Sequence, residues 1–367
     1  MFWAPAFKYL YNCGNRCIFT DTIDALIFSL LFLLLSSIFG QSVIEYYKSK
    51  IQQVIDLRNA KAYDDLLRFF PQDGVGRVVR CALQTANGQV DEIRLRTERP
   101  LSFVSGSNVC YIDRDGEYIG TSDLKNAYVI SKQELAGIYR AVCENSVYAY
   151  LDDIRKGFVT VRGGHRIGFA GRAICGDSGR IENFRDINSI NIRIAREVKD
   201  CAKNIISRIY CGNRVKSTLI ISPPSGGKTT VLRDITRSLS CSGIKVGVAD
   251  DRGEISAMYH GVPQNDIGIN TDVVENAEKS DGIEILQRTM SPSVIVTDEI
   301  VTAREVEAIC KASGTGISII ASIHGYEFNE VLSKPVCEPL FKNNVFELLV
   351  RITGRSETGP EMEVRAL

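Results

Sequence analysis

The residues with the clearest chemistry lie between Leu219 and Val231, in the stretch LIISPPSGGKTTV. An apolar run leads into a turn with two prolines and two glycines, and a helical pattern follows. Backbone N–H groups of such a loop point at phosphate oxygens, and the helix N-terminus adds positive partial charge. A lysine there reaches the β- and γ-phosphates, and the next hydroxyl holds Mg²⁺. The stretch predicts a nucleotide-binding P-loop made of Ser222, Pro223, Pro224, Ser225, Gly226, Gly227, Lys228, Thr229 and Thr230.

One residue departs from the P-loop pattern G-x-x-x-x-G-K-[ST]. Ser222 stands at the position of the first glycine. The two prolines that follow could hold the turn without it, but a chance match to the relaxed pattern is also open. The rest of the chain must therefore supply the other parts of a nucleotide site.

A second group of candidate residues lies in SVIVTDEI, residues 293–300. Four largely apolar strand residues precede Asp298 and Glu299, as in a Walker B segment. Asp298 would hold Mg²⁺, through water or Thr229, and Glu299 would act as general base on the attacking water. Taken alone, the stretch could also be a buried strand that ends in two acids. Its place after a P-loop, with another strand between them, favours the catalytic interpretation.

Two more strand ends carry polar groups. Asp250 and Glu254 follow one apolar strand, and His324 ends another. Ligands bind beyond the carboxyl ends of parallel strands, so these residues are expected beside the P-loop. Glu254 is a candidate second acid near Mg²⁺ or the water, and His324 could sense the γ-phosphate or orient the water. Each could instead be an ordinary solvated loop residue.

Phosphoryl transfer usually gains from an arginine near the γ-phosphate, often supplied by a neighbouring subunit. The region before the P-loop offers Arg166, Arg193 and Arg196, which are candidate arginines acting in trans. Such an arrangement would suit a ring in which one subunit completes the site of the next. The alternative for each is a surface or fold-stabilising charge.

These residues must be positioned by a sheet whose strands alternate with helices. Periodicity predicts strands at 218–222, 245–250, 293–297, 317–323 and 345–352, and helices at 229–240, 282–290, 303–312 and 327–333. This is an α/β fold with a mostly parallel sheet and helices on both faces. Before it, alternating strands and a long amphipathic stretch (131–157) predict a smaller α+β domain. The expected division is an N-terminal extension (1–65) with a connecting helix, the α+β domain (66–200), the P-loop domain (201–355) and a C-terminal tail (356–367).

The composition of the chain limits the classes of function and the cellular location that we expect. Lys+Arg and Asp+Glu are both 44, so the zero net charge argues against bulk nucleic-acid binding. Scattered cysteines favour reduced thiols of a cytosolic protein. The apolar run at 25–40 could be a membrane anchor, an interfacial or partner-binding hairpin, or part of an over-long predicted start. A cleaved signal peptide is not expected, because Asp21 and Asp24 precede the run without a clear cleavage site after it.

The long stretches ISPPSGGKTTVLRDITR, VGVADDRGEISAMYHGVPQNDIG and TDVVENAEKSDGIEILQRTMSPSVIVTDEI, with ASIHG, resemble the sporulation stage III protein AA family. VDEIRLRTERPL and FVTVRGGHRIGFAGRAI resemble it too. That family is similar to the ATPases of type II, type IV and pilus machines. The resemblance implies a RecA-like P-loop domain, ATP and Mg²⁺ as ligands, and a homo-hexamer. It implies work with membrane channel proteins at the mother-cell face of a transenvelope channel during endospore formation. Residues 1–65 lie outside the resemblance.

Three functions remain open. The first is an ATP-hydrolysing motor, cytoplasmic and peripheral to or anchored in the membrane, that energises assembly of or transport through a channel. The second is a nucleic-acid-handling RecA-like ATPase, which the zero net charge and the lack of a recognisable nucleic-acid motif disfavour. The third is a slow nucleotide-binding scaffold, against which Glu299 argues without excluding it.

Overall fold

The computed structural model describes residues 63–367 except 87–89, 145, 147–149, 177, 178, 180, 225, 357 and 358. Residues 64–367 form one compact unit. The apolar run at 25–40 and nearly all of the predicted extension lie outside the described residues. Among the residues that are described, no helix is long and apolar enough to cross a bilayer.

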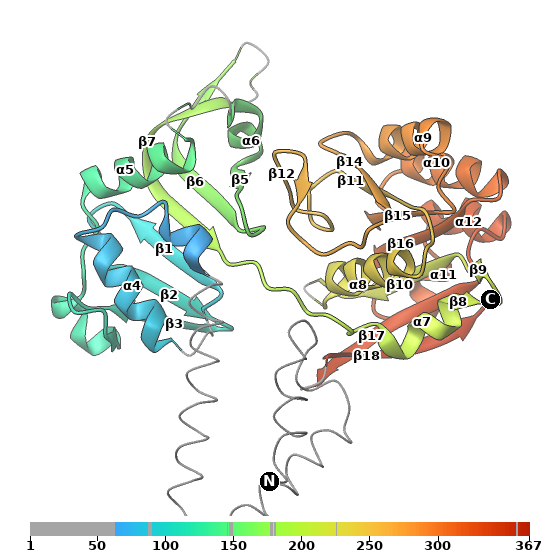
Figure 1. Ribbon diagram of the computed structural model, residues 1–367, viewed down its shortest axis with the longest axis horizontal. Helices are drawn as coiled ribbons and strands as arrows, with labels where there is room; N and C mark the ends of the chain where they lie inside the picture. Colours follow the sequence, from blue (N-terminus) through green and yellow to red (C-terminus); the bar gives the residue numbers. More distant parts are fainter. Residues whose placement is uncertain are drawn as a thin grey trace, which may run out of the picture. The chain divides into compact units, whose positions relative to one another are not determined.

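The C-terminal half contains a seven-stranded sheet in the order β14-β11-β15-β16-β10-β17-β18 (Figure 1). All neighbouring strands are parallel except β17 and β18, which pair antiparallel. The strands are β10 (Thr218–Ser222), β11 (Val246–Asp250), β14 (Thr271–Glu275), β15 (Val294–Glu299), β16 (Ser318–His324), β17 (Leu348–Ser356) and β18 (Gly359–Ala366). The predicted mostly parallel sheet is confirmed.

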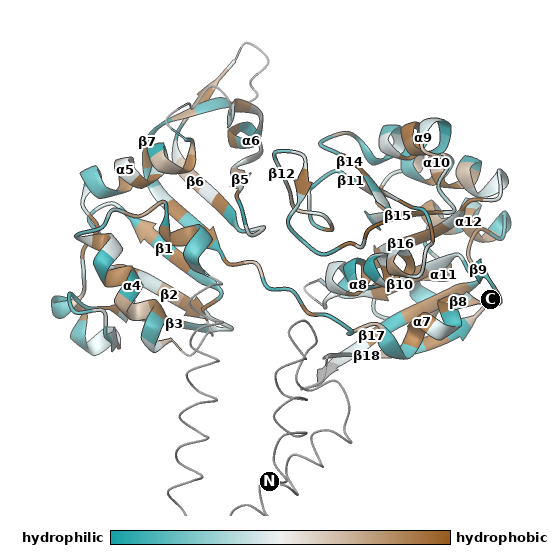
Figure 2. Ribbon diagram, viewed as in Figure 1, coloured by the Kyte–Doolittle hydropathy of each residue, from teal (hydrophilic) through white to brown (hydrophobic). Residues whose placement is uncertain are grey.

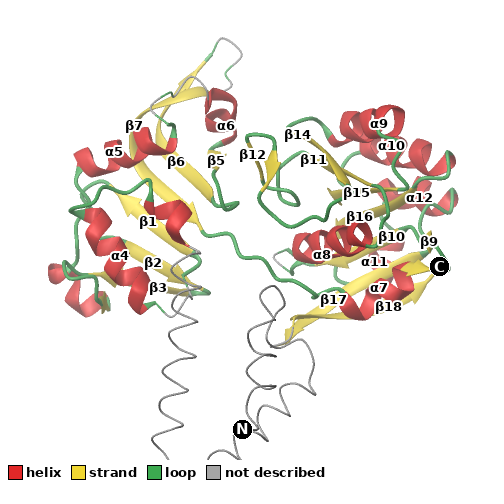
Figure 3. Ribbon diagram, viewed as in Figure 1, coloured by secondary structure: helices red, strands yellow, loops and turns green. Residues whose placement is uncertain are grey.

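Helices cover both faces of this sheet, as Figure 3 shows. They are α7 (Lys203–Ile209), α8 (Lys228–Cys241), α9 (Lys279–Thr289), α10 (Ala303–Gly314), α11 (Phe328–Leu332) and α12 (Glu338–Lys342). Side chains alternate along each strand, so Ile220 packs with α7 and α8 on one face, and Leu219 and Ile221 pack with α9, α10 and α12 on the other. Burial on both faces explains why the central strands are almost continuously apolar (Figure 2).

Two edge strands of this sheet were not predicted. β14 (TDVVE) was expected to be loop, and β18 replaces the expected C-terminal tail. In both strands, polar residues alternate with partly buried ones; Met362 and Val364 of β18 pack against the core. β14 packs Val273 against one face of the core and Val274 against the other, but each of these edge strands carries few apolar residues, so its sequence resembles a polar loop.

The N-terminal half forms an antiparallel seven-stranded sheet in the order β4-β3-β2-β1-β7-β6-β5. Its strands are β1 (Glu92–Arg96), β2 (Ser102–Ser105), β3 (Asn108–Ile112), β4 (Tyr118–Ile119), β5 (Phe158–Thr160), β6 (Arg166–Cys175) and β7 (Ile181–Arg193). Short strands, β1 and β2, lie on either side of Pro100, and the β3–β4 hairpin turns near Gly116. Ile93, Leu95 and Ile192 are fully or almost fully buried in this sheet.

Helices α4 (Val75–Thr85), α5 (Lys132–Val142) and α6 (Leu151–Lys156) accompany this sheet, with a 3₁₀ turn, η1 (Thr121–Asn126). A capping box begins α5: the Ser131 hydroxyl accepts a hydrogen bond from the Glu134 amide, and the Glu134 carboxylate accepts one from the Ser131 amide. The single helical stretch expected at 131–157 is wrong. The chain leaves helical conformation near Glu144, whose φ is 49°, and a helix resumes at Leu151.

Small elements complete the described residues. Two hairpins, β8–β9 and β12–β13, lie outside the main sheets, and a 3₁₀ turn precedes α12. Their bounds are β8 (Tyr210–Cys211), β9 (Arg214–Val215), β12 (Met258–Tyr259), β13 (Val262–Pro263) and η3 (Pro335–Cys337). The segment between Arg193 and Lys203 joins β7 to α7, and β12 follows the acidic turn after β11.

Candidate active site at the strand ends

The P-loop connects β10 to α8, so it lies at the carboxyl end of a central strand. β10 ends at Ser222, and α8 begins at Lys228 directly after Gly227, whose φ of 93° is in the left-handed region. Glycine adopts that conformation without a steric penalty. Thr229 and Thr230 belong to the first turn of α8, Pro224 is exposed, and Ser225 lies outside the described residues.

Ser222 and Gly226 face each other inside the loop. Ser222 is fully buried, and its hydroxyl donates to the Pro223 carbonyl at 3.0 Å. A Cβ on Gly226 would lie 1.9 Å from the Ser222 Oγ. The turn is therefore closed by a serine packed directly against a glycine.

Lys228 lies folded back across the loop. Its Nζ donates to the carbonyls of Ser222 and Pro223 at 3.3 and 3.2 Å and lies 2.8 Å from Nδ1 of His324. The residue is 8% exposed, and burial lowers the pKa of its ammonium group. His324 in turn places Nε2 3.0 Å from Oε2 of Glu299. A continuous chain of contacts therefore runs from Lys228, just after β10, through His324 at the end of β16 to Glu299 at the end of β15.

Sheet register explains how His324 reaches the loop. β10 and β16 are parallel neighbours, and Ser222 pairs with His324 at their last shared position. The Gly325 amide also donates to the Ser222 carbonyl at 3.2 Å. The end of β15 is irregular, because Glu299 pairs with Ser322 after a register shift. A β-bulge of this kind re-aims side chains, and here it accompanies the contact between Glu299 and His324.

Glu254 joins the P-loop helix to the antiparallel sheet. The Thr229 hydroxyl donates to its Oε2 at 3.2 Å, and Arg166 Nη1 lies 3.3 Å from its Oε1. Asp250 shapes the turn that presents Glu254. Its carboxylate accepts hydrogen bonds from the Glu254 amide at 2.8 Å and from the Ser256 amide and hydroxyl at 2.8 and 2.6 Å. Asp250 therefore supports the turn, while Glu254 meets the P-loop.

Asp298 is almost completely buried at the end of β15. Its Oδ1 lies 2.8 Å from Nζ of Lys279, an ion pair in which that oxygen has no aligned hydrogen bond. Burial raises the pKa of Asp298 to about 6, the Lys279 ammonium opposes the shift, and the Asp250 and Glu254 carboxylates add to it. A buried acid surrounded by other acids is a position where a further cation would be stabilised.

The three predicted arginines line one cavity of about 250 Å³ together with Thr229 and Glu254. Arg166 donates to the Arg252 carbonyl at 2.8 Å in addition to its contact with Glu254. Arg193 and Arg196 also form ion pairs with acids near β1, at 3.7 Å to Glu92 and 3.3 Å to Asp91.

Sequence reasoning missed Lys279, Arg233 and Asp234. Arg233, on α8, donates to the carbonyls of Glu254 and Ile255 at 2.8 and 3.2 Å and so also supports the acidic turn. Asp234 and Lys279 are 3% and 7% exposed. A charged residue between apolar neighbours of a helix, as in VLRDITR, was the available signal for Arg233 and Asp234. Lys279 sits in the polar stretch NAEKSDG, where no spacing marks it.

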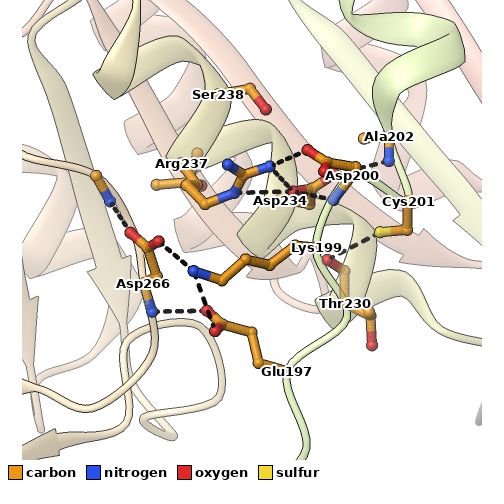
Figure 4. A network of polar contacts seen from close by, with 12 residues as sticks. Glu197, Lys199, Asp200, Cys201, Ala202, Thr230, Asp234, Arg237, Ser238 and Asp266 are labelled. Carbon is orange, nitrogen blue, oxygen red and sulfur yellow. Dashed lines mark hydrogen bonds and ion pairs between the residues drawn. The ribbon is translucent and has the colours of Figure 1, made fainter. Parts of the chain in front are cut away.

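Asp234 fastens the segment before α7 to the P-loop helix, as Figure 4 shows. Its Oδ1 accepts from the Asp200 amide at 3.0 Å, and its Oδ2 accepts from the Ala202 amide at 2.8 Å. Arg237 bridges Asp234 and Asp200, with Nη2 2.7 Å from each Oδ1. Lys199 adds an ion pair with Asp266 at 2.7 Å. The middle of α8, the helix that begins with Lys228 and Thr229, is thus tied to the incoming chain.

Comparisons with known proteins agree with this architecture. The family model described as "Sporulation stage III, protein AA" matches residues 73–364. Stage III sporulation protein AA of Bacillus subtilis (strain 168) is 33% identical over 282 residues, which cover 75% of this chain and 86% of that protein.

Solved structures show the fold at lower identity. The ATPase DotB of Legionella pneumophila superposes with a TM-score of 0.52 and 16% identity, covering 81% of this chain and 82% of that one. The pilus retraction motor PilT with bound ADP gives a TM-score of 0.52 and 14% identity, covering 81% and 83%. The described residues therefore share a mixed α/β fold with these two proteins. With the family match spanning most of its length, the chain belongs to the sporulation stage III protein AA family.

Proposed function

We propose that this chain hydrolyses ATP to ADP and phosphate in a RecA-like P-loop domain formed by residues 201–355, preceded by an α+β domain at 66–200. The observation that carries the proposal is the contact chain from Lys228 through His324 to Glu299. It joins a P-loop lysine to an acid suited to activate water, across three strand ends of one sheet.

Each residue of this contact chain has its own role in the proposed hydrolysis. Phosphate oxygens compete with the Ser222 and Pro223 carbonyls for Lys228, which then binds the β- and γ-phosphates together with the loop amides. Glu299 accepts a proton from the attacking water as the γ-phosphoryl group leaves ADP. His324, which lies between Lys228 and Glu299, orients the Glu299 carboxylate and responds to the γ-phosphate. Glu254 is the second acid beside Thr229.

The oxygen groups around Thr229 fit Mg²⁺, which prefers hydroxyl, carboxylate and water ligands. The buried Asp298 has an oxygen without an aligned hydrogen bond, and burial raises its pKa although the Lys279 ammonium opposes the shift, so a divalent cation would further stabilise the ionised carboxylate. Thr229 and Asp298 would hold the ion, directly or through water. The ion supplies charge compensation at the β- and γ-phosphates.

Arg166 is the arginine best connected to the site, because it pairs with Glu254, which in turn accepts a hydrogen bond from Thr229. We propose that it contacts the phosphates within its own chain, whereas Arg193 and Arg196 remain candidates for a contact across subunits. Arg166 would exchange its bond with Glu254 for the negatively charged γ-phosphate.

The wider role proposed is an ATP-driven motor that energises assembly of or transport through a transenvelope channel during endospore formation. Family membership and the fold shared with DotB and PilT support it. The motor is proposed to be a homo-hexamer in the mother-cell cytoplasm, to work with membrane channel proteins and to act without nucleic acid. Light scattering of the purified chain with nucleotide tests the assembly, and a persistent monomer would contradict it.

Two substitutions with matched controls test hydrolysis. Glu299→Gln should keep nucleotide binding but lower kcat by about 10²-fold or more, because the general base is lost. Lys228→Ala should weaken nucleotide binding by about tenfold or more, because a charge-assisted contact is lost. Glu307→Gln and Lys311→Ala are controls, since both side chains are exposed on α10.

Fluorescent-nucleotide binding and phosphate release measure the two effects separately. Unchanged turnover in Glu299→Gln would remove Glu299 as the base. Ordinary nucleotide affinity in Lys228→Ala would refute the P-loop assignment. A wild-type chain that binds nucleotide without turnover under any condition would favour the scaffold.

A further inference from the structure

Lys279 is a buried lysine in the C-terminal sheet region that the proposed reaction does not use. It is the first residue of α9 and is 7% exposed. Lysine is almost never buried unless its charge is paired. The partners of its ammonium group therefore indicate why it is there.

The ammonium group contacts two consecutive residues of the Walker B segment. Its Nζ lies 2.8 Å from Oδ1 of Asp298 and donates a hydrogen bond to the main-chain carbonyl of Glu299. The carboxylate of Glu305 lies 3.6 Å away. One cation thus contacts both acids of the segment, one by its side chain and the other by its backbone.

Glu305 extends this hold to the turn that follows. Its Oε2 accepts hydrogen bonds from the amides of Val301 and Thr302 at 2.7 and 2.9 Å, and Thr302 caps α10 in return. The four residues from Asp298 to Val301 are therefore fixed at both ends. The side chain of Glu299 emerges from this turn and reaches His324 at 3.0 Å.

We propose that Lys279 is a positioning residue for hydrolysis: its ammonium group fixes the Asp298–Glu299 backbone so that the Glu299 carboxylate stays against His324. The inference rests on the proposed function. It adds a residue from α9 whose ammonium group contacts Asp298, Glu299 and Glu305. A purely structural buried pair would stabilise the fold without selectively affecting turnover.

Lys279→Met tests this proposal, because methionine keeps much of the side-chain length and removes the charge. Its kcat should fall about tenfold or more, the effect of a displaced catalytic group, while KM and ADP affinity stay within about threefold. Hydrogen exchange at the amides of residues 299–302 should accelerate in the nucleotide-free chain, and exchange in β10 should not change. Lys311→Met, which removes an exposed lysine on α10, is the control and should leave both measurements unchanged.

A folded Lys279→Met variant with kcat within twofold of wild type, or with unchanged exchange at 299–302, overturns the proposal. If that variant does not fold, Lys279→Gln replaces it, since its amide is polar but is uncharged and shorter than lysine, so the ion pair with Asp298 and the reach to the Glu299 carbonyl are both lost. It should lower kcat in the same direction, and full activity with unchanged exchange would again overturn the proposal. Absence of hydrolysis in the wild-type chain refutes the proposed function instead, and the exchange data alone then decide whether Lys279 holds the turn.

Discussion

Replacing Asp234 with alanine should loosen the attachment of the incoming segment to the P-loop helix and destabilise the fold strongly. Asp234 is 3% exposed and accepts the amides of Asp200 and Ala202. Ala202 is fully buried, so its amide loses the Asp234 carboxylate as acceptor at a position away from the surface. Arg237 keeps one partner, Asp200.

The cost follows from these contacts. A buried donor left unsatisfied costs about 1–3 kcal/mol, the less buried Asp200 amide adds about 1 kcal/mol, and losing one partner of Arg237 adds about 1 kcal/mol. The free energy of unfolding should therefore fall by about 3–5 kcal/mol in Asp234→Ala. Asp234→Asn keeps the shape and one acceptor oxygen, so its loss should be smaller, about 1–3 kcal/mol.

Urea unfolding followed by circular dichroism measures the total effect, and hydrogen exchange locates it. The amides of Asp200 and Ala202 should lose protection first, whereas the central strand β10 should keep its protection relative to the global unfolding reaction. Asp272→Ala, at an exposed position of β14, is the control and should change stability by less than about 0.5 kcal/mol. A loss below about 1 kcal/mol in Asp234→Ala, with protected amides at 200 and 202, would refute this reasoning.

Two further predictions concern the segments around β6. His165 is 3% exposed and accepts the Ala195 amide at 3.0 Å, and burial lowers its pKa from 6.5 to about 4. As the pH falls, the unfolded chain protonates His165 before the folded chain does, so the free energy of unfolding should fall between about pH 6.5 and pH 4, by up to about 3 kcal/mol. In His165→Gln, the free energy of unfolding should depend less steeply on pH. The same pH dependence in the variant and the wild type would contradict this. Arg166→Ala should lower kcat. If Arg166 acts in its own chain, mixing Arg166→Ala chains with Lys228→Ala chains should not restore phosphate release. Recovered phosphate release in the mixture would instead show a contact between subunits.

Sequence patterns located most of the strands that form the site. Central parallel strands are buried on both faces, so β10, β11, β15 and β16 are runs of apolar residues that end in polar ones. Their carboxyl ends must meet at one edge of a sheet. That argument alone predicted that Lys228, Glu299 and His324 would be neighbours.

The missed features depend on packing that a local pattern does not contain. β14 and β18 are edge strands with mixed polar and apolar residues, which local sequence does not distinguish from loops. Lys279 begins α9 in a polar stretch, and its burial follows only from how α9 packs beside β15. The chain leaves helical conformation after α5 at Glu144, whose φ is positive, and local periodicity does not mark that residue.

The facing pair in the P-loop has a consequence for how such loops vary. Ser222 and Gly226 compete for one small volume: a Cβ at 226 would lie 1.9 Å from the Ser222 Oγ and 3.3 Å from its Cβ, so a side chain there would displace the serine hydroxyl. In this loop the position that sterically favours glycine is therefore residue 226, four residues after the usual position at 222. Among relatives, a hydroxyl residue at the first P-loop position (222 here) should be accompanied by glycine at the fifth (226 here). Glycine at the first position should allow a residue with a side chain at the fifth. Relatives with side chains at both positions and an intact loop would contradict this exchange. A search pattern that insists on glycine at the first position would overlook every member of the first kind.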